Sequence, residues 1–146
     1  NVALQEEIER TKSYLEIELV RFRDKLKIFW DIDNTLENFE VPSLILQPLV
    51  ENAIKHCVGK SMHGGTITIE AINDDSSVEI AVINKANGET TSAPLNNKGL
   101  GIGLDNIQSR LTILYGDRAA LTHGPIDQNG YEVRITITST GRENTV

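Results

Sequence analysis

Apolar residues recur along this chain with two different periods, and the change of period divides the chain into predicted helices and strands. Over residues 3 to 24 they recur at steps of three, four or seven, with Glu, Lys and Arg between them. This spacing predicts a long amphipathic helix, whose apolar seam lies on the rest of the domain or on a partner helix. Residues 27 to 32 are rich in aromatic and β-branched side chains and predict a strand, and Asp33-Asn34 predicts the turn after it.

A second helix is predicted to begin after Val41-Pro42, with Ser43 as its N-cap. Pro48 falls inside this helix, where we expect it to remove one hydrogen bond and kink the axis. Gly59 is the expected stop. The apolar residues of the predicted buried face are Leu44, Ile45, Leu46, Leu49, Val50, Ala53 and Ile54.

Strict alternation of apolar and polar residues follows over 66 to 72 and 77 to 83, on either side of Asn73-Asp74-Asp75. This pattern is typical of a β-hairpin. From Asn84 to Lys98 the chain is rich in Asn, Gly, Thr and Ser and poor in apolar residues, which predicts a loop or lid.

The remaining segment predicts a third helix and two closing strands. The helix is marked by apolar positions from Ile102 to Leu114 and ends near Tyr115-Gly116. The strands cover 119 to 122 and 131 to 138 around a turn at 127 to 130, and the tail from 139 to 146 is predicted to fray. The order of elements predicts an α+β fold, a two-layer sandwich in which helices cover one face of a mixed, mostly antiparallel sheet.

Composition narrows the function classes. A net charge of −7 and a pI near 4.9 argue against sequence-independent binding of nucleic acid, which needs a basic face. The single Cys57 excludes a disulfide framework within the chain and favours a reducing compartment. No run of 18 apolar residues is present. Because the chain begins at Asn1 and not at Met, we expect it to be a piece of a longer protein.

Two motifs together indicate a nucleotide site. Glu51-Asn52-Ala53-Ile54-Lys55-His56 places an acid, an amide oxygen and two nitrogen-bearing side chains on the second predicted helix. Gly99-Leu100-Gly101-Ile102-Gly103-Leu104 offers a flexible backbone that can wrap phosphate oxygens before a helix whose N-terminal N–H groups favour anions.

Other phosphate motifs fail on their spacing. Gly59-Lys60-Ser61 ends like a P-loop, but Ile54 stands where the earlier glycine is required. The glycine cluster is spaced G-x-G-x-G and lacks the following acidic residue of a dinucleotide-binding fold. Neither a G-x-S-x-G elbow nor a protein-kinase H-R-D loop is present.

The chain resembles the ATP-binding catalytic domain of two-component sensor histidine kinases, within the ATPase superfamily that includes type II topoisomerases, Hsp90 and MutL. Within these kinases the chain resembles the LytS/YehU-like branch. This resemblance implies the Bergerat-type ATP-binding fold. The residues that carry it are Tyr14 to Glu18, Arg21-Phe22, Val41-Pro42, Leu46 to His56, Gly99 to Leu104, Asn106-Ile107 and Arg110-Leu111.

The resemblance assigns roles to the first motif, which is similar to the family's N box. It implies that Asn52 binds Mg²⁺ through its amide oxygen, a ligand type that suits a hard cation shared with phosphates. Lys55 and His56 are expected to contact phosphate. Two roles are open for Glu51: it orients a nucleophile or a Mg²⁺-bound water, or it accepts a proton.

The glycine motif resembles the family's G2 box, whose backbone N–H groups face the triphosphate of ATP. Lys98, next to it, is expected to close over the nucleotide as part of the lid. The family's G1 box, usually D-x-G-x-G, is altered here, because Asn84 stands where the aspartate contacts adenine. An amide oxygen still accepts a hydrogen bond, so Asn84 is expected to bind the base, with weaker affinity or relaxed selectivity.

The altered G1 segment leaves an alternative open: a non-catalytic interaction module, or pseudokinase, that acts through the N-terminal helix. A third alternative is a protein-serine kinase of the anti-sigma type, against which the block from Tyr14 to Phe22 argues by resemblance.

The phosphoacceptor stretch of this branch, N-P-H-F-L-F-N, is not in the chain. The resemblance therefore implies that phosphate goes to a histidine on a separate dimerisation domain, within a homodimer, and then to a response regulator. We expect residues 1–26 to be the end of the dimerisation helix, 27–140 the ATP-binding domain and 141–146 a flexible tail. The domain is expected to be cytoplasmic, in a protein attached to the inner (plasma) membrane of a bacterium.

Overall fold

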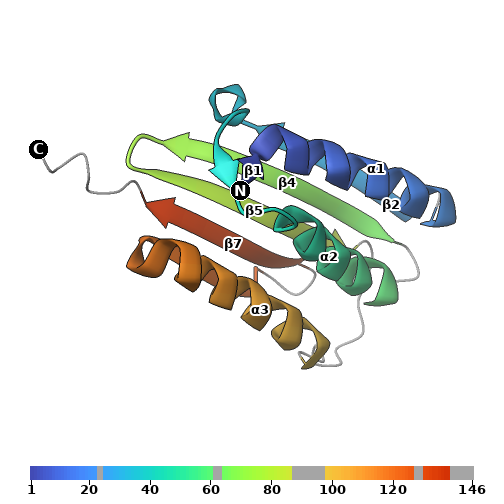
Figure 1. The fold of residues 1–146 in the computed structure, drawn as a ribbon. Helices are drawn as coiled ribbons and strands as arrows, with labels where there is room; N and C mark the ends of the chain where they lie inside the picture. The colour runs from blue at the N-terminus through green and yellow to red at the C-terminus, as the bar shows by residue number, and fades with distance from the viewer. Residues whose placement is uncertain (23–24, 61–63, 87–97, 127–129, 139–146) are drawn as a thin grey trace, which may run out of the picture.

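The computed structural model describes residues 1–22, 25–60, 64–86, 98–126 and 130–138. One layer is a five-stranded sheet in the order β2-β4-β5-β7-β6, and the other layer consists of three helices on one face of it (Figure 1). The helices are α1 (Leu4–Phe22), α2 (Leu46–Lys60) and α3 (Lys98–Tyr115). The sheet strands are β2 (Leu26–Ile32), β4 (Gly65–Asp74), β5 (Ser77–Ala86), β6 (Ala119–Pro125) and β7 (Gly130–Thr138).

The sheet is mixed in the way that the sequence predicts. Strand β2 pairs with β4 in parallel, from Leu26 opposite Gly65 to Ile32 opposite Ala71. The other three pairings are antiparallel, including the hairpin of β4 and β5 that spans Asp74 and Ser77. A small second sheet joins β1 (Val2–Ala3) to β3 (Glu40–Val41), and one-turn 3-10 helices occur at η2 (Asn34–Leu36) and η3 (Gly116–Arg118).

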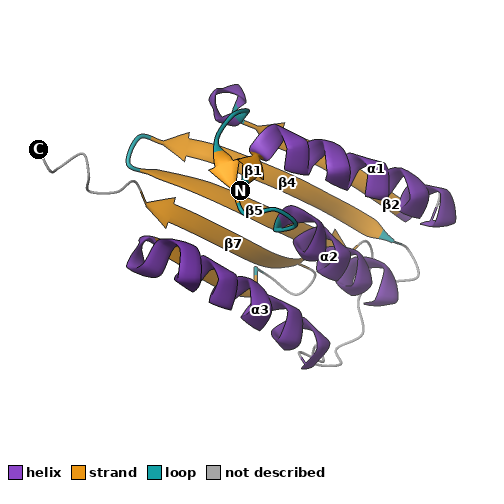
Figure 2. Ribbon diagram, in the orientation of Figure 1, coloured by secondary structure: helices purple, strands orange, loops and turns teal. Residues whose placement is uncertain are grey.

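Side-chain alternation separates the two faces of the sheet. The residues of β4, β5 and β7 that point toward the helices are buried, while the outer face carries polar side chains such as Arg134, which pairs with Glu79 at 2.8 Å and Glu132 at 3.1 Å. Figure 2 shows the helices on one face of the sheet. Because strand residues alternate by face, the apolar half of β4, β5 and β7 packs under these helices. The predicted two-layer α+β fold is therefore confirmed.

The N-terminal helix contributes to this core, because Leu4, Ile8 and Leu15 on α1 are buried with the sheet residues. On the other side of α1, Ile17 and Val20 are 66% and 71% exposed. In the described part of the chain, no helix is both long and apolar enough to cross a membrane.

Two expectations about α2 were wrong. The helix begins at Leu46, two residues later than a Ser43 cap requires, and Glu7 on α1 accepts hydrogen bonds from the amides of Ile45 and Leu46. Pro48 consequently lies in the first turn, where backbone N–H groups have no partner within the helix, so it costs no helical hydrogen bond.

The glycine-rich region also differs from the prediction. Residues 84 to 86 continue β5, so Asn84 lies in a strand and not in a loop. Helix α3 already begins at Lys98 and includes the glycines at 99, 101 and 103. The apolar positions at 100, 104, 107 and 111 are spaced by four, three and four, which extends the helical pattern through the glycines. The predicted lid segment from 87 to 97, the turn at 127 to 129 and the tail from 139 lie outside the described residues.

Candidate functional site

Helix α2 presents successive residues of the first motif in three directions. At about 100° per residue, Glu51 and Lys55 share one side, Asn52 lies on the next side, and Leu49 and Ala53 share the side that faces the sheet. The structure agrees, because Leu49 and Ala53 are buried, Glu51 and Asn52 are half-buried and Lys55 is exposed. The residues predicted to act together are thus distributed around the helix.

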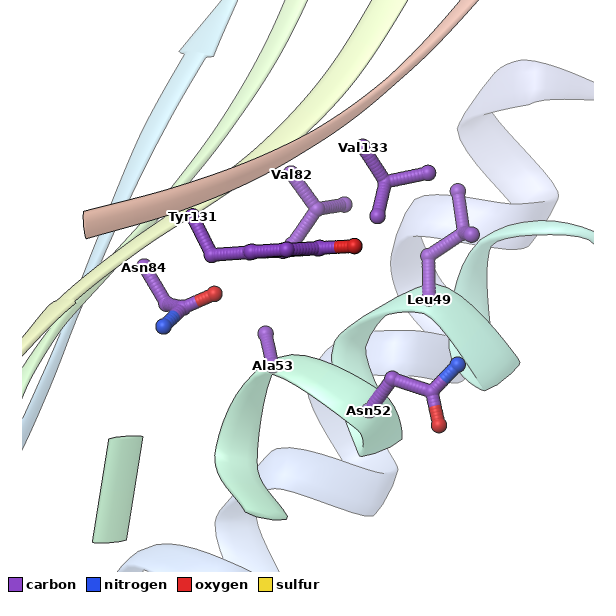
Figure 3. A pocket seen from close by; sticks show the side chains of 7 residues that line it. All are labelled: Leu49, Asn52, Ala53, Val82, Asn84, Tyr131 and Val133. Atoms are coloured by element: carbon purple, nitrogen blue, oxygen red, sulfur yellow. The ribbon is translucent and has the colours of Figure 1, made fainter. Parts of the chain in front are cut away.

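A small cavity lies between α2 and the inner face of the sheet, with a volume of about 10 Å³. This volume holds about one water molecule. Figure 3 shows Asn84 and Tyr131 on the strands facing Ala53 on the helix, while the amide of Asn52 is directed away from Asn84. The lining residues are Leu49, Asn52, Ala53, Val82, Asn84, Tyr131 and Val133.

Asn84 is the polar member of an apolar row on β5. The inward-pointing residues before it, Val78, Ile80 and Val82, are all buried, and Asn84 itself is only 5% exposed. Burying an amide costs free energy that an apolar side chain does not cost. An amide at this point of the row therefore indicates a use for its hydrogen-bonding atoms.

Tyr131 is a lining residue to which the sequence analysis gave no role. It is buried at the start of β7, and its hydroxyl oxygen lies 2.6 Å from Nδ1 of His123 on β6. Burial raises the pKa of Tyr131, so the phenol stays protonated. The alternation of apolar and polar residues along β7 was the signal in the sequence that could have identified Tyr131, because it places Tyr131 on the same face of the sheet as Val133.

A second and larger cavity, of about 450 Å³, lies between α1 and α2. Burial, followed by the negative charges of Glu18 and Glu51, raises the pKa of Tyr14 on its wall to about 12, against the opposing effect of Arg21. Arg21 in turn pairs with Glu18 at 3.3 Å. The lining residues are Tyr14, Glu18, Arg21, Phe22, Glu51, Ile54 and Lys55.

The structure therefore brings some predicted site residues together and separates others. Asn52 and Asn84 line one cavity, although they come from different elements, whereas Glu51 and Lys55 line the other cavity with α1. His56 lies in α2 and Lys98 to Leu104 form the first turns of α3, where Leu104 is buried. The side chains of His56 and of residues 98 to 103 are outside the described part.

Metal ligands are sparse among the residues with described positions, which contain no group of three or more His, Cys, Asp and Glu that can hold a metal ion. The donor at the expected Mg²⁺ position is an amide oxygen, that of Asn52. A single amide ligand fits a Mg²⁺ ion whose other ligands are phosphate oxygens and waters, and it does not fit an ion that is bound by protein ligands alone.

Comparison with solved structures defines the class of the fold. The catalytic domain of the histidine kinase ThkA, in a nucleotide-free form, superimposes with a TM-score of 0.68 at 19% identity, over 97% of this chain and 95% of that chain. The full-length histidine kinase ShkA, in complex with AMPPNP, superimposes with a TM-score of 0.64 at 18% identity, over 95% of this chain and 31% of that chain. The fold is that of a histidine kinase catalytic domain.

Sequence comparison then gives the family. The chain is 34% identical over 144 residues to the sensor protein LytS of Bacillus subtilis (strain 168), which covers 93% of this chain and 24% of that protein. It is 36% identical over 125 residues to the sensor histidine kinase YpdA of Escherichia coli (strain K12), which covers 80% of this chain and 21% of that protein. No protein-family model matches. The chain belongs to the LytS-like sensor histidine kinases, and it spans about a quarter of the length of these curated relatives.

Proposed function

We propose that the chain is the Mg²⁺-ATP-binding catalytic domain of a two-component sensor histidine kinase. In this proposal it delivers the γ-phosphoryl group of ATP to a histidine on a dimerisation domain. The observation that carries the proposal is the pair of amide side chains, Asn52 on α2 and Asn84 on β5, that line one cavity under a helix of the kinase fold. ShkA, which shares this fold, is described in complex with an ATP analogue.

The residues divide into three tasks. The amide oxygen of Asn84 accepts a hydrogen bond from the amino group of the base, and Tyr131 forms part of the apolar wall beside it. Asn52 provides the protein ligand to Mg²⁺, and a bound Mg²⁺ neutralises phosphate charge. The first backbone N–H groups of α3 have no partner within the helix and favour phosphate oxygens.

Lys55 and Glu51 contribute from the α1 side of the helix. Lys55 is exposed and offers a positive point charge to the end of the triphosphate. Glu51 accepts a hydrogen bond from Gln47 at 3.0 Å, which holds its carboxylate beside the cavity between α1 and α2. From there Glu51 orients the attacking group or accepts its proton.

The partners in the proposal follow from the family. They are the dimerisation domain of the same protein, a second kinase subunit and a response regulator, and the whole protein is attached to the membrane. The division at residue 26 stays a prediction. The exposed Ile17 and Val20 on α1 are the residues through which we expect this helix to reach the dimerisation domain.

Calorimetric titration with a non-hydrolysable ATP analogue, with and without Mg²⁺, tests the proposal. We expect saturable binding that depends on Mg²⁺, and we expect Asn52→Ala to abolish that dependence while the protein stays folded. Asn38→Ala is the matched control, because Asn38 is an exposed amide in the turn before β3. Unchanged Mg²⁺ dependence in Asn52→Ala would remove Asn52 from the site.

A non-catalytic interaction module is the second candidate function. The observation in its favour is the size of the cavity beside Asn84, which at about 10 Å³ has room for a water and not for a purine. In this case the titration gives no heat of binding from a folded sample at high ligand concentration. A sedimentation experiment would then show self-association that Ile17→Asp and Val20→Asp abolish.

A further inference from the structure

The short loop between β3 and α2 is held from two helices at once. On one side the buried carboxylate of Glu7, on α1, accepts hydrogen bonds from the amides of Leu44 at 2.9 Å, Ile45 at 2.9 Å and Leu46 at 3.2 Å. These are the last loop amides and the first amide of α2, which have no partner within the helix. The carboxylate also carries the negative charge that the N-terminus of a helix favours.

On the other side the loop is bound by Arg110 from α3. Its Nη1 donates to the carbonyl oxygen of Leu44 at 3.1 Å, and its Nη2 donates to the carbonyl oxygen of Ser43. The planar guanidinium thus contacts two successive carbonyls, which a lysine ammonium cannot do with the same geometry. The N–H of Leu44 therefore donates to Glu7 on α1, and the carbonyl oxygen of Leu44 accepts from Arg110 on α3.

The conformation of Leu44 shows that this loop depends on those hydrogen bonds. Its φ is 57°, in the left-handed region that a leucine rarely adopts. Its side chain is 51% exposed, so burial of the leucine does not hold the backbone there. A conformation of this kind persists only where the surroundings determine it.

The loop is placed where it affects the proposed nucleotide site. It leads directly into α2, which carries Asn52, and Arg110 lies on α3, whose first turns contain the glycine segment. Figure 1 shows α2 and α3 next to each other on the same face of the sheet. A bond from α3 to the start of α2 therefore fixes where one helix lies relative to the other.

We propose that Arg110 is a positioning residue, which sets the separation of α2 and α3 by binding the carbonyls of Ser43 and Leu44. Glu7 completes the arrangement from α1, so that all three helices meet at this loop. The inference rests on the proposed function, which places the base beside α2 and the phosphates at the first N–H groups of α3. Arg110 itself does not contact the nucleotide in this arrangement.

The test compares the dissociation constant of the non-hydrolysable ATP analogue, with Mg²⁺, for the wild-type chain and four variants. Arg110→Ala is expected to weaken binding by about tenfold. Arg110→Lys keeps the charge and reaches one carbonyl, so its loss is smaller, and Arg110→Gln keeps a donor without the charge. Arg118→Ala is the control: it removes the same positive charge from a residue whose guanidinium lies over Tyr115, 5.6 Å from the ring centre.

Each result has one reading. A wild-type chain that is folded and binds no nucleotide overturns the proposed function. A wild-type chain that binds, together with an Arg110→Ala variant that binds equally well, overturns this inference alone. Equal weakening in Arg110→Ala and Arg118→Ala also overturns it, because general loss of charge then explains the effect.

Hydrogen exchange provides a readout that does not need nucleotide. In Arg110→Ala we expect faster exchange of the Leu44 and Ile45 amides, while amides in the β5–β7 pairing exchange as in the wild type. Unchanged exchange at the loop overturns the inference. If Arg110→Ala does not fold, Arg110→Lys and Arg110→Gln are measured in the same two ways.

Discussion

Glu7 and Asn84 are both polar, both buried and both packed among apolar residues, with exposed fractions of 1% and 5%, but their surroundings differ. The carboxylate of Glu7 meets three backbone amides and the guanidinium of Arg10 at 3.0 Å. Asn84 lies at the end of an apolar row and borders a small cavity between α2 and the sheet.

This difference separates a structural polar group from one that serves a ligand. A buried group whose partners all belong to the fold contributes to stability, and its removal leaves backbone groups without partners. A buried group beside a cavity is less tightly bound to the fold, so its replacement by an apolar side chain is tolerated while binding is lost. The first description fits Glu7, and we expect the second to fit Asn84.

Glu7→Ala is the substitution with the largest expected effect on this comparison. It leaves the amides of Leu44, Ile45 and Leu46 without their acceptor, so we expect the free energy of unfolding to fall by about 3 kcal/mol. Urea denaturation followed by circular dichroism measures the change. Glu16→Ala, at an exposed position of the same helix, is the control and should change stability by less than about 0.5 kcal/mol. A loss below about 1 kcal/mol for Glu7→Ala would show that other contacts hold the loop.

For Asn84→Leu we expect a smaller effect on stability, either none or a small gain, in contrast to the loss expected for Glu7→Ala. Replacing a buried amide by an apolar side chain of similar size is expected to leave the free energy of unfolding unchanged, or to raise it by about 1 kcal/mol. Binding of the ATP analogue is expected to weaken by at least about tenfold. The same denaturation and titration experiments measure both quantities, with Asn38→Leu as the exposed control. Unimpaired binding by Asn84→Leu would mean that this amide does not contact the base.

The sequence predicted the fold well where local patterns decide the structure. The helix spacing from Leu4 to Phe22 and the alternation on both sides of Asp75 were correct because each element buries one face. The cap of α2 was wrong because its acceptor, Glu7, lies 37 residues before Leu44 in the chain. No local pattern contains that information.

The positions of the candidate site residues could be predicted only in part for the same reason, and their roles stay predictions. Asn52 and Asn84 were identified from motifs, and the fold brings both to one cavity. Glu51 and Lys55 line a cavity with residues of α1, and the motif alone could not show which element lies opposite them. Tyr131 was missed because a tyrosine at the start of a strand has the same pattern whether it fills a core or lines a site.

Tyr14 offers the smallest expected effect and sharpens the comparison, because its phenol is partly buried and also lies near the charges of Glu18, Glu51 and Arg21. Its pKa is raised from 10.0 to about 12, so the folded state holds the phenolic proton more tightly than the unfolded chain does. The resulting contribution to stability is present below pH 10 and is lost as the pH rises from 10.0 to about 12.

Glu51→Gln tests the cause of the Tyr14 shift. Removing this negative charge is expected to lower the pKa of Tyr14 from about 12 toward 10.0, by less than the whole shift, because burial and Glu18 remain. Tyrosinate absorbance as a function of pH measures the change, and Tyr14→Phe identifies which of the tyrosine transitions belongs to Tyr14. Glu16→Gln, on the exposed side of α1, should leave the transition where it is. A Tyr14 transition that stays in place in Glu51→Gln would mean that the charge of Glu51 does not act on Tyr14, and that burial and Glu18 keep the phenol protonated.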